Sequence, residues 1–304
     1  MNRFWLLLII AVMTSSCGGS ATQYIEGSKD FTGEIGKIVD IPNQSDLREM
    51  GDSLQEYMLE FNFKSGISGQ LNPLTQEQTD YIFDAQKYAG TPQINPDYKA
   101  PGKVEIVFSN GSIAKLDKVT LKFTALELTS NAVPPADIEY SGERREMTAE
   151  LAEKIARFWF DRYNFDLKNF QLNPITVGQS TSVVFTEKLA DSDVASPNYI
   201  KAVINYWGMI EGFEINVGPT PTIGTKPTLG ETGIKDKAKQ FLALPTDFEL
   251  NVIPVRVIKR IYKEENGKLT FTDKLAWFID ASGYKIESRN QILTLDAHTG
   301  MPIQ

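Results

Sequence analysis

Residues 148–163, TAELAEKIARFWFDRY, have the pattern of an amphipathic helix. Thr148 stands where a side-chain oxygen caps the first turn, and apolar residues then recur three and four positions apart. This apolar stripe consists of Ala152, Ile155, Ala156, Trp159 and Tyr163. Strand-like runs follow at 182–185, 200–207 and 213–217. Residues 142–219 are therefore predicted to form one α+β module, a helix followed by several strands.

Residues 228–304 repeat the order of one helix followed by several strands. Thr228 is the expected cap, and Ile234 and Ala238 begin the apolar stripe of a helix that should be regular from about Ile234. Asn266-Gly267 is a strong hairpin signal between runs of alternating apolar residues. The strands are predicted at 251–262, 275–279, 284–287 and 292–295. The shared order indicates an α+β fold with a degenerate duplication of one module.

The region before these modules, residues 44–141, is predicted to be helical and then to form a hairpin. Ser45 is the expected cap of a helix whose apolar stripe runs from Leu47 to Phe61. A second helix is predicted at 75–90. Farther along, Asn110-Gly111 indicates a tight turn. The two strands of this hairpin are predicted at 104–108 and 119–123.

Residues 1–16 have the organisation of a signal peptide. Arg3 is positively charged, and Phe4–Met13 is an apolar run that is too short to cross a bilayer, which requires about 20 residues. The small residues that follow end at Cys17, the only cysteine of the chain. Residues 17–43 are predicted to be a tether and an extended entry segment, because Gly, Ser and Thr are frequent there.

Ser15-Ser16-Cys17 resembles the end of the lipobox of bacterial lipoproteins, although Thr14 stands where that motif usually has leucine. The resemblance implies that Cys17 carries acyl chains such as palmitate and anchors the protein to a membrane. Gly18 is not the aspartate that can retain such proteins at the inner membrane, which favours an extracytoplasmic position on the outer membrane. The alternative is an ordinary secretory signal with an incidental cysteine.

The composition excludes several classes of function. The chain has 304 residues, a formal net charge of −8 and no basic run, so nucleic acid is not an expected partner. Its single histidine, His298, excludes a two-histidine zinc site within one chain and is expected to be a surface residue in a loop. There is no P-loop and no GxGxxG motif. We therefore expect no cofactor, no metal and no catalytic residue.

The last strand and its turn read ILTLDAHTGMPI, residues 292–303. This stretch resembles the closing signature of PepSY-type domains, which also occur in the propeptides of thermolysin-like proteases. Residues 213–218, which close the first module, keep the glycine but lack the rest of the signature. Within the signature Asp296, Thr299 and Gly300 are expected to shape a turn, in which Asp296 accepts backbone N–H groups and Gly300 adopts a positive φ. The resemblance implies an antiparallel sheet with a helix packed on one face in each of the two C-terminal modules. It also implies protease inhibition, chaperoning or ligand sensing outside the cytoplasm.

Aromatic residues are the remaining candidates for ligand contact. Trp159 faces the predicted core, so Phe160, rotated by about 100° on the helix, is expected to be exposed. Tyr206, Trp207 and Trp277 lie in strand pairs of which one member can face outward. The sequence favours a non-enzymatic protein that binds a protein or peptide partner, such as a regulator of a protease. The alternatives are a glycan-binding lipoprotein, suggested by these rings, and a hydrolase that uses two carboxylates.

Overall fold

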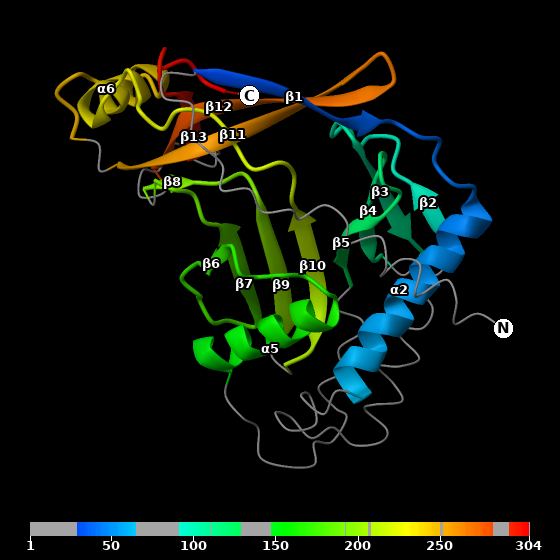
Figure 1. Ribbon diagram of the computed structural model, residues 1–304. Coiled ribbons are helices and arrows are strands. Elements are labelled where there is room, and N and C mark those ends of the chain that lie inside the picture. Colours follow the sequence, from blue (N-terminus) through cyan, green and yellow to red (C-terminus); the bar gives the residue numbers. More distant parts are fainter. Residues whose placement is uncertain are drawn as a thin grey trace. The chain divides into compact units, whose positions relative to one another are not determined.

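A computed structural model describes residues 29–64, 91–109, 111–128, 147–191, 193–205, 208–249, 252–281 and 292–303. The chain forms two compact units (Figure 1). Among the described residues, unit 1 contains 37–185 and 199–216, and unit 2 contains 29–36, 186–198 and 217–303. Both units combine antiparallel sheets with few helices, so the predicted α+β class is confirmed. Cys17, the helix predicted at 75–90 and the strand predicted at 284–287 lie outside the described residues.

Unit 1 is built on one sheet of eight strands in the order β2-β3-β4-β5-β10-β9-β7-β6. Each pair of neighbouring strands with a defined register in this sheet is antiparallel, as the alternating sequence pattern predicts. In chain order, the strands are β2 (Pro92–Ile94), β3 (Lys103–Phe108), β4 (Ile113–Asp117), β5 (Phe123–Glu127), β6 (Phe170–Leu172), β7 (Ser180–Glu187), β9 (Tyr199–Asn205) and β10 (Ile210–Asn216).

The pairing of β5 with β10 joins two regions that the sequence treats as separate. Glu127 lies opposite Gly212, and Leu126 lies opposite Phe213, in an antiparallel register. Leu126 and Phe213 are both buried in one core. Residues 44–141 and the module predicted at 142–219 therefore contribute to the same sheet, because their apolar faces are buried together.

Two helices cover one face of this sheet, α2 (Gln44–Lys64) and α5 (Ala149–Arg162). The ring of Trp159 on α5 packs between Phe61 of α2, with centroids 4.8 Å apart, and Phe213 of β10, with centroids 6.1 Å apart. The predicted cap of α5 is confirmed, because the Thr148 side chain accepts the N–H of Leu151. The aromatic rings fill the space between these helices and the strands.

Two local predictions in unit 1 are corrected. The side chain of Asn43, and not that of Ser45, accepts the first N–H groups of α2, those of Ser45 and Asp46. The first strand of the predicted hairpin forms as β3, but its partner is β4 at 113–117, and residues 118–122 are the turn between β4 and β5 and not a strand. The carboxylate of Asp117 accepts the N–H groups of Val119 and Thr120 in this turn, and Leu121 has a φ of 53°.

Unit 2 is a sheet in the order β1-β12-β11-β8, with β13 also paired to β12. The hairpin turn at Asn266-Gly267 is confirmed by the φ values of 53° and 71° at these residues. The short β8 pairs with β11 in parallel, which is the exception to the antiparallel pattern. The strands are β1 (Asp30–Lys37), β8 (Val194–Ala195), β11 (Ile253–Glu265), β12 (Lys268–Asp280) and β13 (Ile292–Asp296).

The helix of unit 2, α6 (Glu231–Phe241), begins three residues before the predicted Ile234. Its cap residue is Gly230, which makes no side-chain bond to the helix. Ile234 and Ala238 are fully buried and belong to a core with Leu275 of β12. The helix packs on one face of the sheet, as predicted for this module. Across the described ranges of both units, no helix is both long enough and apolar enough to cross a bilayer.

Candidate functional site

The predicted exposure of Phe160 is wrong, because its ring is fully buried. The chain turns back after α5 and places Phe165 against it, with ring centroids 6.2 Å apart. Phe185 of β7 contacts the ring from another side, with centroids 6.1 Å apart. The helix therefore has apolar neighbours over more than one stripe. Phe160 is a core residue and offers no surface to a ligand.

Trp277 is also a core residue and not a ligand contact. Its side chain is buried among the apolar residues of unit 2, and its indole N–H donates to the carbonyl oxygen of Leu229 at 2.9 Å. A buried indole requires such an acceptor, so the contact explains the residue without a ligand. Tyr206 and Trp207 lie outside the described residues.

The turn signature has the structural role that was predicted for it. A carboxylate oxygen of Asp296 accepts the N–H of His298 at 2.8 Å and the N–H of Thr299 at 3.0 Å, and Gly300 has a φ of 71°. Burial acts to raise the pKa of Asp296, but these two N–H donors and Lys274 together lower it. The Nδ1 atom of the half-buried His298 lies 2.8 Å from Oγ1 of Thr228, so Thr228 contacts this turn and does not bond to the helix.

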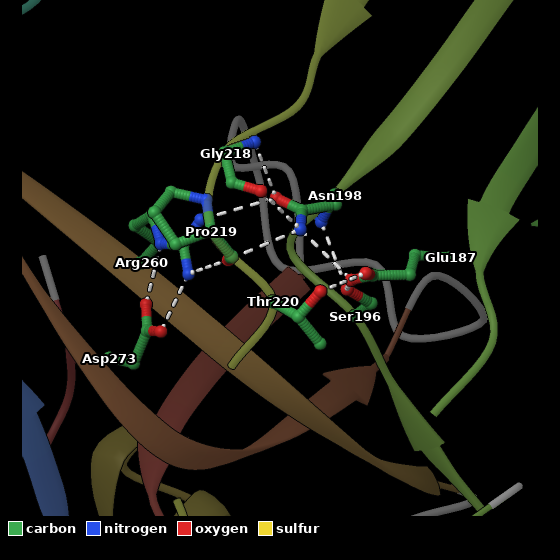
Figure 2. Close-up of polar contacts among 8 residues, drawn as sticks. All are labelled: Glu187, Ser196, Asn198, Gly218, Pro219, Thr220, Arg260 and Asp273. Carbon is green, nitrogen blue, oxygen red and sulfur yellow. Dashed lines mark hydrogen bonds and ion pairs between the residues drawn. The ribbon is translucent and has the colours of Figure 1, made fainter. Parts of the chain in front are cut away.

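A buried ion pair lies at the centre of a polar cluster in unit 2 (Figure 2). Arg260 on β11 and Asp273 on β12 are 7% and 0% exposed, and two N–H···O bonds of 2.7 Å join them. The guanidinium also donates to Oδ1 of Asn198 and to the carbonyl oxygen of Pro219. It lies over the ring of Phe271, 4.3 Å from the centroid.

Asn198 connects this ion pair to two further segments. Its amide nitrogen donates to Glu187 and to the carbonyl oxygen of Gly218, and its oxygen accepts the N–H of Gly218. Figure 2 shows Glu187 held in turn by the hydroxyls of Ser196 and Thr220, at 2.8 and 2.7 Å. These eight residues form the Arg260 network, in which Arg260 and Asp273 neutralise each other and neutral donors hold the carboxylate of Glu187. The network therefore holds these segments of unit 2 together and is not a candidate binding site. Its members are Glu187, Ser196, Asn198, Gly218, Pro219, Thr220, Arg260 and Asp273.

Unit 1 has a depression of about 280 Å³ on its sheet. The lining residues alternate along β4 and β9 with buried core residues, so the depression opens on the face opposite to α2 and α5. The polar side chains that line it are Lys115, Glu127, Ser180, Ser182, Lys201, Glu211 and Glu214. The depression is the candidate functional site, because its charged side chains do not form ion pairs with one another as Arg260 and Asp273 do.

One row of side chains across the depression is rich in lysine. Cross-strand pairs place Lys115 opposite Ala125, Ala125 opposite Glu214, and Glu214 opposite Lys201. The hydroxyl of Tyr199 donates to Oε1 of Glu214 at 2.8 Å. Within the described residues, neither Lys115 nor Lys201 forms a salt bridge. On β3, Glu105 lies opposite Lys115, and its carboxylate accepts a hydrogen bond from the Asn95 amide. This lysine row thus contains two ammonium groups and two carboxylates that are engaged by neutral donors.

The neighbouring row contains a glutamate and no lysine. Ile113 lies opposite Glu127, Glu127 opposite Gly212, and Gly212 opposite Val203. A Cβ atom on Gly212 would lie 2.8 Å from the carbonyl oxygen of Leu126, so the close strand pairing here requires glycine. The two rows are two residues apart along each strand, which is about 7 Å.

A β-bulge in β10 adds a second carboxylate to this glutamate row. The register with β9 shifts between Ile210 and Gly212, at Glu211. The bulge directs the Glu211 side chain to Ser180, whose hydroxyl donates to Oε1 at 2.5 Å. Burial raises the pKa of Glu211, and the charge of Glu127 raises it further, while hydrogen bonds from Ser180 and Asn205 oppose the change.

The sequence analysis did not identify any of these residues. A signal was present, because Lys115, Glu127, Lys201 and Glu214 each alternate with buried apolar residues in a strand. What the sequence does not show is the strand order that brings these four residues together. Among the described residues, no group of three or more His, Cys, Asp or Glu side chains could hold a metal ion.

Comparisons with known proteins gave two solved structures. No family model and no curated protein matches the chain. The C-terminal domain of YpeB from Bacillus megaterium is 11% identical over 75% of this chain and 95% of its own, with a TM-score of 0.29. An uncharacterised protein from Eubacterium rectale ATCC 33656 is 12% identical over 93% of this chain and 89% of its own, with a TM-score of 0.36. At such TM-scores the likeness carries no conclusion about function.

Proposed function

We propose that this protein is a lipid-anchored protein of the bacterial cell envelope that binds a polypeptide in the depression of unit 1. The observation that carries the proposal is the depression itself, with a lysine row and a glutamate row on a sheet face that neither of the described helices of unit 1 covers. Groups of both signs, with serine hydroxyls beside them, match the mixed polar surface of a polypeptide. The proposed role is binding and not catalysis.

The proposed position and partner class come from the two ends of the sequence. The lipobox-like residues before Cys17 support a lipid anchor on the outer membrane. The turn at Asp296–Gly300 follows three antiparallel strands and the helix α6, which is the element order expected of a PepSY-type domain. A protease is therefore the partner class that we propose for this protein as a regulator.

Site-specific photo-crosslinking tests whether the depression contacts a polypeptide in cells. A photoreactive amino acid replaces Val203, which lines the depression without carrying charge. The matched control replaces Ile94, an exposed apolar residue of the same unit on β2. Irradiation is expected to give discrete protein adducts from position 203, which mass spectrometry identifies, and none of these from position 94.

The opposite results are equally clear. Absence of adducts from position 203 in cells that carry the protein at its normal level would contradict polypeptide binding in the depression. The same adducts from both positions would mean that the contact is nonspecific. The lipid anchor is tested by the variant Cys17→Ser. If the proposed anchor were wrong, the variant and the native chain would be found in the membrane fraction to the same extent.

A carboxylate-based hydrolase is the second candidate, because Glu211 has a raised pKa beside the carboxylate of Glu127. One protonated and one ionised carboxyl group in a depression are the requirement for acid–base glycoside hydrolysis. A panel of nitrophenyl glycosides tests this activity, with Glu211→Gln as the variant that should abolish turnover. Equal release of nitrophenol by both proteins would reject the hydrolase.

The glycan-binding alternative has lost two of the rings that suggested it. Phe160 and Trp277 are buried and contact core residues. Tyr206 and Trp207 lie outside the described residues. No described aromatic residue lines the depression except Phe213, whose ring packs on Trp159 and Tyr163.

A further inference from the structure

The two charged rows of the depression have the spacing of an extended peptide. Side chains at positions i and i+2 of an extended chain point to the same side, about 7 Å apart. The lysine row and the glutamate row are also two residues apart along their strands. A peptide that lies along the strand direction can therefore place successive same-side residues over successive rows.

The two rows differ in the groups that are left without a partner of opposite charge. The glutamate row has Glu127 and Glu211, and within the described ranges neither of them has a cationic partner in a salt bridge. In the lysine row the carboxylates of Glu214 and Glu105 accept hydrogen bonds from neutral donors, whereas Lys115 and Lys201 form no salt bridge within the described residues. A ligand with a single sign of charge would satisfy one row and be repelled by the other.

We propose that the depression selects extended peptide segments in which a basic and an acidic side chain stand two residues apart. The basic side chain lies over Glu127 and Glu211, and the acidic one lies over Lys201. Ser180 already donates to Glu211 and so holds that carboxylate in place for the basic group. This inference rests on the proposed function, since it names the polypeptide class that the depression recognises.

Fluorescence anisotropy with four labelled peptides tests the selectivity. The peptides are acetylated and amidated forms of TVKVEVT, TVEVKVT, TVKVKVT and TVEVEVT, and the protein is the full-length chain in detergent. Either mixed peptide can satisfy both rows, because the chain direction can reverse. Both are expected to bind at least about tenfold more tightly than the two peptides of uniform charge, because each of the latter leaves a like-charge contact.

Two conservative variants then assign the rows. Glu127→Gln should lower the affinity for the mixed peptides several-fold and raise the affinity for TVEVEVT relative to them. Lys201→Gln should likewise lower the affinity for the mixed peptides and raise that for TVKVKVT relative to them. The controls are Glu150→Gln and Lys154→Gln, which change exposed charges on the far side of α5 and should leave all four affinities unchanged.

The outcomes separate this inference from the proposed function. Equal binding of mixed and uniform peptides would overturn the selectivity while polypeptide binding in the depression stands. Preference for TVKVKVT alone would assign the site to basic segments and would also overturn it. Failure of every peptide to bind, with adducts still formed at position 203 in cells, would reject the linear charge pattern alone; failure of both experiments would reject the proposed function.

Discussion

The Arg260 network of unit 2 and the depression of unit 1 contain the same kinds of side chain in different electrostatic states. Arg260 and Asp273 are buried and bonded to each other twice, and Asn198 adds a further contact. In the depression, Glu127 is exposed and Glu211 is half-buried, and they share one row without a cation in the described structure. The ion pair of the network is therefore complete within the protein, whereas the carboxylates of the depression are free to interact with a ligand.

Burial explains the difference between these two clusters. A charge that is removed from water without a partner costs several kcal/mol, so the charges of the Arg260 network must be paired for unit 2 to fold. A half-exposed charge retains part of its hydration and can remain unpaired at small cost. Stability should therefore respond to changes in the network, and ligand binding should respond to changes in the depression.

The largest expected effect is that of Asp273→Ala. This change leaves the guanidinium of Arg260 buried without its carboxylate, which should lower the free energy of unfolding of unit 2 by about 3–5 kcal/mol. Urea denaturation followed by circular dichroism measures the loss. Glu127→Ala in the depression is the matched carboxylate removal and should change stability by no more than about 0.5 kcal/mol.

The double variant Arg260→Met/Asp273→Leu sharpens this comparison. It removes both charges, so most of the lost stability should return, by several kcal/mol relative to Asp273→Ala. A double variant as unstable as the single one would show that the contacts of Arg260 to Asn198 and Pro219, and not the ion pair, hold the network together.

A smaller loss, about 2–3 kcal/mol, is expected for Asn198→Ala. The change removes the acceptor of the Gly218 N–H and one acceptor of Arg260, and it also removes the amide that donates to Glu187. Ser182→Ala, which truncates a polar side chain of the depression, is the control and should be nearly neutral. Equal losses of stability in both variants would contradict the distinction between the structural Arg260 network and the depression.

Asp296→Asn should cost about 1 kcal/mol at pH 7, because charged acceptors bind N–H groups more strongly than neutral ones. The folded-state pKa of Asp296 is lowered, so its contribution is complete above the unfolded value of about 3.9 and is lost as the pH falls through the folded value. The difference between variant and native chain should therefore close below about pH 4. Asp247→Asn, at an exposed position, is the control.

Asp296 also shows which features the sequence could predict. Its turn depends on residues that are neighbours in the chain, as do the cap at Thr148 and the hairpin at Asn266-Gly267, and the structure confirms all three. Such features need only local backbone geometry and a nearby donor or acceptor. The α+β class followed from the same local signals, because helix and strand periods differ.

The candidate site could not be predicted because it depends on pairing between distant segments. Glu127 and Gly212 meet only because β5 pairs with β10, and no local pattern specifies that neighbour. The error at Phe160 has a related cause, since the ring is covered by Phe165 and Phe185, one of them on a separate strand. Helical periodicity places a residue on a face but does not say how many sides of the helix are covered.

Glu211→Gln should have the smallest effect on stability, and its sign is opposite to that of the network variants. The folded-state pKa of Glu211 is raised, mainly by burial, so the folded chain retains a proton at pH values where the unfolded chain, near about 4.3, has lost it. Native stability therefore falls as the pH rises through this window, and the cost is complete above the folded value.

The Gln variant removes this cost together with the repulsion from Glu127. It should be more stable than the native chain by about 0.5 kcal/mol at pH 7 and equal to it near pH 4, as measured by thermal unfolding across this pH range. The same variant should bind the mixed peptides more weakly. Gain of stability with loss of binding is the signature of a charge that is kept for a ligand, whereas a loss of both would class Glu211 with the Arg260 network.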